Sequence, residues 1–184
     1  MKWMIASDIH GSAYWTRRLV ARWKEEQPDR VILLGDLLYH GPRNALPQEY
    51  DPQQVIALLS QIQPAPLCVR GNCDAEVDQM VLPFPIMADY GVISDGTLTA
   101  FFTHGHLYNR QTPLPVRAGE VLLCGHFHVP ELERQAAGWW YANPGSVSIP
   151  KDGSANQYLM LEDGTFAWKN MDGTTLCTRT LQAD

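Results

Sequence analysis

Two short stretches near the N-terminus decide the fold class: "KWMIASD" at residues 2–8 and "RVILLGD" at residues 30–36. Both are apolar runs that end in aspartate, and they flank residues 11–28, where large apolar residues recur at helical spacing. A strand–helix–strand order places the two strands side by side and parallel. The second run is apolar enough to be buried on both faces, which is typical of the interior of an α/β sheet.

Local signals define where the helices begin and end. Ser12 is suited to cap the first helix and Pro28 to stop it. A second helix is predicted to begin after Asp51, with Pro52 in its first position and Gln54 completing a capping box. The run "PLCVRGNCD" then predicts a third strand, so the first half of the chain has the order βαβαβ.

Beyond Pro83 the pattern changes to short strands, with Asp163-Gly164 as a hairpin turn between two of them. They are predicted within 98–106, 121–128, 138–146, 158–170 and 175–180. No linker-like segment separates the two halves. We therefore expect one α/β domain over residues 1–184, with two sheets packed face to face.

Composition excludes several function classes. Hydrophobic residues make up 45% of the chain, and the formal net charge is −6, which argues against polymeric nucleic acid or an anionic membrane as the partner. No apolar run is long enough for an export signal or a membrane span. The four cysteines show no C-x-x-C spacing, so we expect reduced thiols and a cytoplasmic protein.

Each predicted strand of the α/β core ends in side chains that can bind a metal ion. They are Asp8, His10, Asp36, Asn72, His104, His126 and His128. Any one of them has an ordinary explanation: an H-x-H pair can be a hydrogen-bonded surface pair, and Asp or Asn can simply stabilise a turn. Because ligands bind beyond the carboxyl ends of such strands, where loops converge, we expect one shared metal site.

The ligand types restrict the metal. Imidazole suits Mn, Fe, Zn or Cu, and a site this rich in nitrogen does not suit Ca or Mg alone. Seven ligands are too many for one tetrahedral zinc, but they fit two ions if Asp36 bridges them. Two ions about 3.5–4 Å apart hold a bridging hydroxide and clamp a phosphoryl group. With two carboxylates the site keeps a formal charge of about +2, which favours a phosphate ester over a neutral peptide.

The motifs "D-x-H", "G-D", "G-N-x-D", "T-H-G-H" and "G-H-x-H", in this order, resemble those of the calcineurin-like metallophosphoesterases. The resemblance runs from Asp8 to about Ser148, and "HGPRNALP", "RGNCDAEVDQM" and "NPGSVSIPK" resemble the bacterial YfcE-type phosphodiesterases. It implies a four-layered α/β/β/α sandwich of two mixed sheets flanked by helices. It also implies two divalent ions, commonly Mn²⁺, with Fe, Zn, Co or Ni as other candidates.

The resemblance also implies roles for individual residues. Asp8, His10, Asp36 and His128 would hold one ion, and Asp36, Asn72, His104 and His126 the other. His10, Asp36, Asn72 and Asp74 are the catalytic candidates, with Asp74 also suited to fix a loop. Apart from the resemblance, the positions of His40, Arg43, Cys73 and His106 make them candidates for substrate contact, and His40 or His106 could also serve as an acid. His40 and Arg43 could equally be a solvated pair on their loop, and His106 could instead orient Asp8 or His104.

One position departs from the wider superfamily. Many members have a histidine where this chain has Cys73, and that histidine helps to protonate the leaving group. A free thiol is neutral at pH 7 and cannot act as that cation. We therefore expect better activity on esters with good leaving groups than on alkoxide esters.

The leading interpretation is a phosphoesterase that hydrolyses a small phosphodiester by attack of a metal-bridging hydroxide. Two alternatives are a phosphomonoesterase and a catalytically weak interaction scaffold like the retromer subunit of similar fold. A nuclease is disfavoured because the chain is short and acidic. The natural substrate and any homo-oligomeric state stay open.

Overall fold

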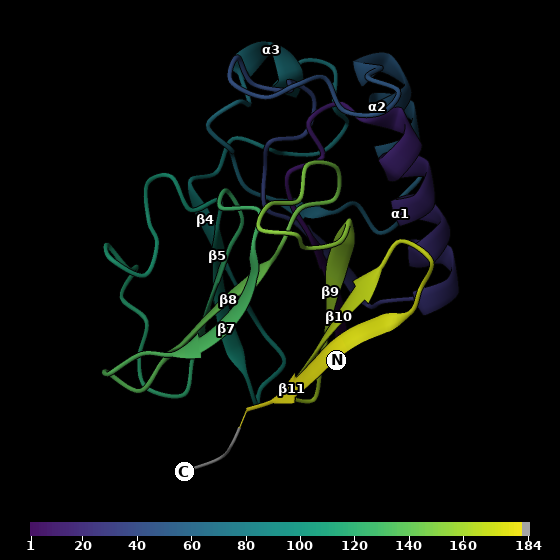
Figure 1. Ribbon diagram of the computed structural model, residues 1–184. Helices are drawn as coiled ribbons and strands as arrows, with labels where there is room; N and C mark the ends of the chain where they lie inside the picture. The colour runs from purple at the N-terminus through teal and green to yellow at the C-terminus, as the bar shows by residue number, and fades with distance from the viewer. Residues whose placement is uncertain (182–184) are drawn as a thin grey trace.

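The computed structural model describes residues 1–181 (Figure 1). The first half alternates strands and helices: β1 (Lys2–Ala6), α1 (Ala13–Glu26), β2 (Arg30–Leu33), α2 (Pro52–Leu59) and β3 (Leu67–Cys68). After the short helix α3 (Glu76–Gln79) come β4 (Tyr90–Ser94), β5 (Thr99–Thr103), β6 (Val121–Cys124), β7 (Pro130–Arg134) and β8 (Trp140–Pro144). The chain closes with β9 (Gln157–Glu162), β10 (Thr165–Asn170) and β11 (Thr175–Thr180). The predicted βαβαβ order is confirmed.

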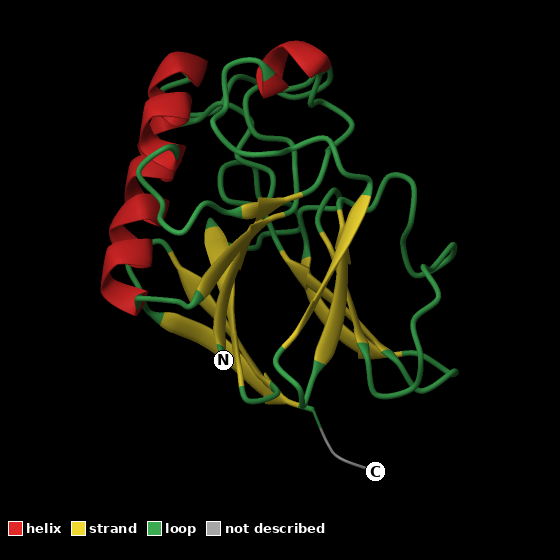
Figure 2. Cartoon of the chain, turned by 180° about the vertical axis from the view of Figure 1, so that it is seen from behind, coloured by secondary structure: helices red, strands yellow, loops and turns green. Residues whose placement is uncertain are grey.

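The strands form two mixed sheets, as expected (Figure 2). The six-stranded sheet has the order β11-β10-β9-β1-β2-β3, with β1, β2 and β3 parallel and β9 antiparallel to β1. The five-stranded sheet has the order β4-β5-β6-β8-β7, with β5, β6 and β8 parallel. In each sheet, the carboxyl ends of the parallel strands therefore lie at the same end of the sheet. The predicted metal ligands follow the strands there.

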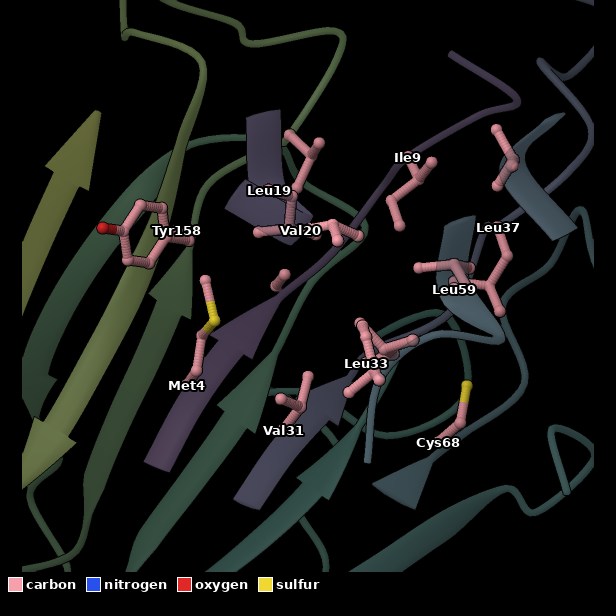
Figure 3. Packing of buried hydrophobic residues seen from close by; sticks show 14 of the residues in the cluster. Met4, Ile9, Leu19, Val20, Val31, Leu33, Leu37, Leu59, Cys68 and Tyr158 are labelled. Carbon is pink, nitrogen blue, oxygen red and sulfur yellow. The ribbon is translucent and has the colours of Figure 1, made fainter. Parts of the chain in front are cut away.

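Three apolar clusters define the layers. Helices α1 and α2 cover the outer face of the six-stranded sheet, where Leu19 packs near Met4 and Tyr158 (Figure 3). A second cluster, which includes Ile5 of β1 and Leu123 of β6, fills the space between the sheets.

The outer face of the five-stranded sheet is covered by a loop. Leu122 and Tyr141 on that face are buried against Leu114, with Tyr108 packed beside them, and both covering residues belong to the segment 104–120. Within residues 1–181 this layer contains no helix. The predicted α/β sandwich of two mixed sheets is confirmed, and the layer over the five-stranded sheet is formed by the segment 104–120.

The expected helix caps are present. The hydroxyl of Ser12 accepts a hydrogen bond from the Trp15 N–H at 3.3 Å, and Asp51 accepts one from the Gln54 N–H at 3.0 Å. These bonds satisfy N–H groups that have no partner inside the helix. Within residues 1–181 no helix is both long and apolar enough to cross a bilayer.

Three elements, α3, β4 and β7, are absent from the sequence-based expectation. Both missed strands lie at edges of the five-stranded sheet, where one side of the strand has no neighbour. Edge strands need few apolar residues, and they tolerate charge and proline. The segments "YGVIS" and "PELER" therefore lack the alternating apolar pattern by which strands are recognised.

We predict that Leu123→Ala lowers the free energy of unfolding by about 3 kcal/mol, because Leu123 is fully buried between the sheets and its removal leaves a cavity. Urea unfolding measures the effect. Leu107→Ala, at a position that is 44% exposed, is the matched control and should change stability by less than about 0.5 kcal/mol. Equal losses in the two variants would contradict this account of the core.

Candidate active site

The structure brings all seven predicted ligands together. Asp8 and His10 follow β1, Asp36 follows β2, Asn72 follows β3, His104 follows β5, and His126 and His128 follow β6. Contacts of 3.1–3.7 Å link them in one cluster: Asp8–His128, His128–His10, His10–Asp36, Asp36–His104, His104–Asn72 and His104–His126. The segments that directly follow these strands, the strand exits, thus come from both sheets and form a single site.

Left-handed backbone conformations turn the chain sharply at these exits. Asp8, His10, Asp36, His126 and His128 all have positive φ, between 49° and 64°. This region costs a residue with a Cβ atom about 1 kcal/mol or more, so it persists only where the surrounding structure enforces it. Five such residues in one cluster indicate that the backbone is arranged to aim their side chains at a common point.

Two glycines allow the strand exits to approach each other. A Cβ atom on Gly71 would lie 2.0 Å from Asp36 Oδ1, and one on Gly125 would lie 1.9 Å from Ser7 Oγ. Distances this short are impossible for real atoms. Glycine is therefore required where the β3 exit passes Asp36 and where the β6 exit passes the end of β1.

Backbone carbonyls set the orientation of three imidazoles. The Nδ1–H groups of His10, His104 and His128 donate to the carbonyls of Tyr39, Leu34 and Ile149, at 2.9, 2.6 and 2.5 Å. Each ring is thereby held with Nε2 facing the cluster. A backbone acceptor on the outer nitrogen is the arrangement usual for histidines that bind metals.

The donor atoms fit divalent metal ions. His10 Nε2 and His128 Nε2 lie 3.4 Å apart, so their lone pairs repel each other unless a proton or a cation lies near both. Asp8 Oδ1 is buried and faces His128 Nε2 at 3.2 Å, and the other carboxylate oxygen accepts the His126 N–H at 3.0 Å. The donor atoms of Asp8, His10 and His128 lie within 4.8 Å of one another, as do those of Asp8, Asp36 and His104.

Burial and charge shift the pKa values of the cluster. Burial opposes the charged form of His104, but the hydrogen bond and charge of Asp36 outweigh burial and raise its pKa to about 9. Burial and the positive charge on His104 lower the pKa of His126 to about 4. Although burial favours the neutral carboxyl, the neighbouring histidines hold the pKa values of Asp8 and Asp36 below their usual range. In the metal-free protein, protons on histidine thus balance the buried carboxylates, and metal ions would displace them.

A cavity of about 230 Å³ opens onto the cluster. Its lining contains His10, Asp36, Asn72, Cys73, His126 and His128, together with Arg43. Asp8 and His104 are fully buried, with no exposed surface. Two of the predicted substrate contacts, Arg43 and Cys73, therefore lie where a substrate would bind.

The remaining candidates lie outside this lining. Asp74, predicted as a catalytic residue, accepts hydrogen bonds from the N–H groups of Asp36, Leu37 and Gly71 at 2.7–2.8 Å. With its oxygens occupied, Asp74 ties the segments after β2 and β3 together, which agrees with the loop-fixing alternative, and its catalytic role stays a prediction.

Neither His40 nor His106 lines the cavity. The ring of His40 contacts Tyr39 and Tyr50, with centroid distances of 4.8 and 5.2 Å. His106 packs against His104 at 5.4 Å, and burial lowers its pKa. The predicted substrate contacts from these two residues find no support in this geometry.

Sequence reasoning missed the contribution of residues 146–151. The hydroxyls of Ser146 and Ser148 both donate to the Asp8 carbonyl, at 2.9 and 3.1 Å, and so stabilise its left-handed turn. Lys151 also lines the cavity. The only sequence signal for this segment was the string "NPGSVSIPK", because neither serine nor lysine belongs to a metal-binding pattern.

Comparison with known proteins agrees with the fold and identifies the family. Residues 1–164 match the model of the calcineurin-like phosphoesterase superfamily domain, and the chain belongs to that family.

Particular relatives are similar over most of their length. Phosphodiesterase YfcE of Escherichia coli K12 is 44% identical over 163 residues, which cover 89% of this chain and 88% of that protein. A solved structure described as YfcE, a phosphoesterase from E. coli, superposes with a TM-score of 0.94 at 39% identity, covering 99% of this chain and all of the other. Vps29 of Entamoeba histolytica in complex with Zn²⁺ shares the fold, with a TM-score of 0.64 at 18% identity and 98% coverage of both chains.

We predict that the metal-free protein loses stability as the pH rises from about 6.5 to about 9. The folded-state pKa of His104 lies above its ordinary value of 6.5, so the protonated ring contributes stability that is complete below 6.5 and is lost as the pH passes through about 9. Urea unfolding in EDTA should show a decrease on the order of 1–3 kcal/mol over this interval. His104→Gln should flatten the decrease, and a constant or rising stability in EDTA would refute the assignment.

Proposed function

We propose that this chain is a metal-dependent phosphodiesterase with a dinuclear centre at the cluster of Asp8, His10, Asp36, Asn72, His104, His126 and His128. The observation that carries the proposal is the burial of two carboxylates, Asp8 and Asp36, among imidazoles whose outer nitrogens are occupied by backbone carbonyls. Such a cluster presents carboxylate oxygens and imidazole nitrogens at close spacing, which is the donor set of divalent transition metals.

Side chains of the cluster would position the metal ions. Asp36 lies between His10 and His104, at 3.7 and 3.5 Å, and it is the carboxylate placed to serve two ions. Divalent ions bound there would polarise a phosphoryl oxygen and supply a hydroxide nucleophile at neutral pH. The left-handed turns after the strands would hold the donor atoms in place during turnover.

The preference for diesters rests on the 44% identical relative, which is named a phosphodiesterase. The scaffold alternative is supported only by likeness of fold to Vps29, at 18% identity. The presence of Arg43 and Lys151 in the cavity supports the monoesterase alternative, because a doubly charged ester needs cations in addition to the metal ions. A panel of mono- and diesters assayed with Mn, Mg, Zn, Fe, Co and Ni in turn separates these possibilities.

Manganese as the cellular metal stays a prediction, and so do the cytoplasmic location and the absence of a polymeric nucleic-acid partner. The four cysteines are free thiols in the structure, which is compatible with a reducing compartment.

Asp36→Asn should lower turnover of a diester by at least about 10³-fold and reduce the bound metal to less than one ion per chain, because the carboxylate shared by both ions is lost. Turnover and elemental analysis are measured on the same sample. Asp163→Asn, on the exposed β9–β10 turn, is the matched control and should leave both unchanged. Full metal content and activity in Asp36→Asn would argue against a bridging role.

Cys73→His should raise activity on alkyl diesters by about 10-fold or more while changing activity on nitrophenyl diesters little. Burial raises the pKa of the Cys73 thiol to about 12, so the native residue stays neutral and is a poor proton donor. Steady-state kinetics on both ester types provides the measurement. Cys73→Asn can donate a hydrogen bond but no proton, and a gain in that variant equal to the gain in Cys73→His would rule out acid catalysis as the cause.

A further inference from the structure

Two cationic side chains reach the cavity from separate loops. Arg43 belongs to the loop after β2, beside Gly41, where an added Cβ would lie 3.2 Å from Cys73 Sγ. Lys151 belongs to the loop after β8, and its N–H donates to the His128 carbonyl at 3.2 Å. One cation thus comes from the side of Cys73 and the other from the side of His128.

Neither cation has a partner of its own. Among residues 1–181, the side chains of Arg43 and Lys151 form no hydrogen bond and no ion pair. Elsewhere many cations of this acidic chain are paired with carboxylates, for example Arg70 with Asp89 at 2.8 Å. Both residues are exposed and line the cavity, so two cations without a carboxylate partner are available there to an anionic ligand, in addition to any bound metal ions.

A simple phosphodiester does not match this charge. It has one negative charge, which the metal ions would already neutralise, so the two cations would be left without an anion. Arg43 and Lys151 line the same cavity as the residues of the cluster, so a second anionic group that meets them has to lie close to the first. Two directly linked phosphates, each carrying one negative charge, satisfy this requirement.

We propose that Arg43 and Lys151 form a subsite for the second phosphate of a pyrophosphate diester, and that this class of phosphoanhydride is the preferred substrate. The inference rests on the proposed phosphodiesterase function. Water adds to one phosphorus, the bond from that phosphorus to the bridging oxygen breaks, and the bridging oxygen leaves with the second phosphate. Two phosphate monoesters form, and the protons of water pass to solvent.

The cavity wall is consistent with such a leaving group. A departing phosphate monoester is a stable anion that two cations can hold, and it needs no proton from the protein. The wall near Arg43 offers Cys73, whose thiol is only a weak hydrogen-bond donor. A substrate with an alkoxide leaving group would lack the acid that it requires.

The test compares two diesters whose leaving groups have similar basicity. One is P¹,P²-di(adenosine 5′) pyrophosphate, and the other is adenosine 5′-(4-nitrophenyl phosphate), which lacks the second phosphate. Arg43→Ala and Lys151→Ala should each lower kcat/KM for the pyrophosphate at least about 10-fold more than they lower kcat/KM for the nitrophenyl ester. Arg43→Lys and Lys151→Arg should keep part of the selectivity. Arg117→Ala, which removes a cation outside the cavity lining, is the control and should change neither.

A binding measurement complements the kinetics. Calorimetry with and without Mn²⁺ compares AMP with adenosine 5′-(α,β-methylene)diphosphate, whose P–C–P link is not hydrolysed. The wild-type protein should bind the two-phosphate analogue at least about 5-fold more tightly, and the alanine variants should lose that advantage.

The outcomes separate the two proposals. Failure to cleave either diester overturns the proposed function and the inference with it. Cleavage of the nitrophenyl ester with no cleavage of the pyrophosphate, or equal losses on both in the variants, overturns the inference alone. Equal losses on 4-nitrophenyl phosphate would also overturn the inference, because the cations would then serve a single dianionic phosphate.

Discussion

The burial of two carboxylates side by side is the constraint on which the rest of this protein depends. Asp8 and Asp36 are almost without exposed surface, and a carboxylate removed from water is costly unless positive charge lies beside it. In the metal-free chain, protonated histidines supply that charge, and the same groups would release their protons if divalent ions bound. Folding and the proposed metal binding would therefore depend on one electrostatic balance.

Hydrogen bonds and glycines around the cluster hold its residues in position. Asp74 joins the β2 and β3 exits through three backbone N–H groups, and two serines hold the carbonyl of Asp8. Gly71 and Gly125 let these segments approach more closely than any other residue would allow. Hydrogen bonds from residues next to the cluster thus stabilise its left-handed backbone conformations. These bonds leave the donor atoms of the cluster free.

The net charge of the chain is negative, whereas the side chains Arg43 and Lys151 in the cavity are positive. A net charge of −6 disfavours extended anionic partners, yet the cavity that leads to the cluster contains unpaired cations. This contrast suits a small anionic substrate that fits inside the cavity, since long anions would meet the acidic surface. Under the proposed function, the wall residue Cys73 would also affect substrate choice, because a thiol with a raised pKa is a poor proton donor to a leaving group.

The sequence by itself determined the central βαβαβ unit, the two mixed sheets and the seven side chains of the cluster. Buried parallel strands must be apolar, and their exits must carry the reactive groups, so both signals lie within short continuous runs. The edge strands β4 and β7 and the loop that covers β6 and β8 escaped prediction because neighbours, not local pattern, hold them in place. Only the tertiary structure decided that Asp74 ties loops, that His40 lies among aromatic rings and that Lys151 reaches the cavity. These roles depend on contacts between segments far apart in the chain, which no local pattern encodes.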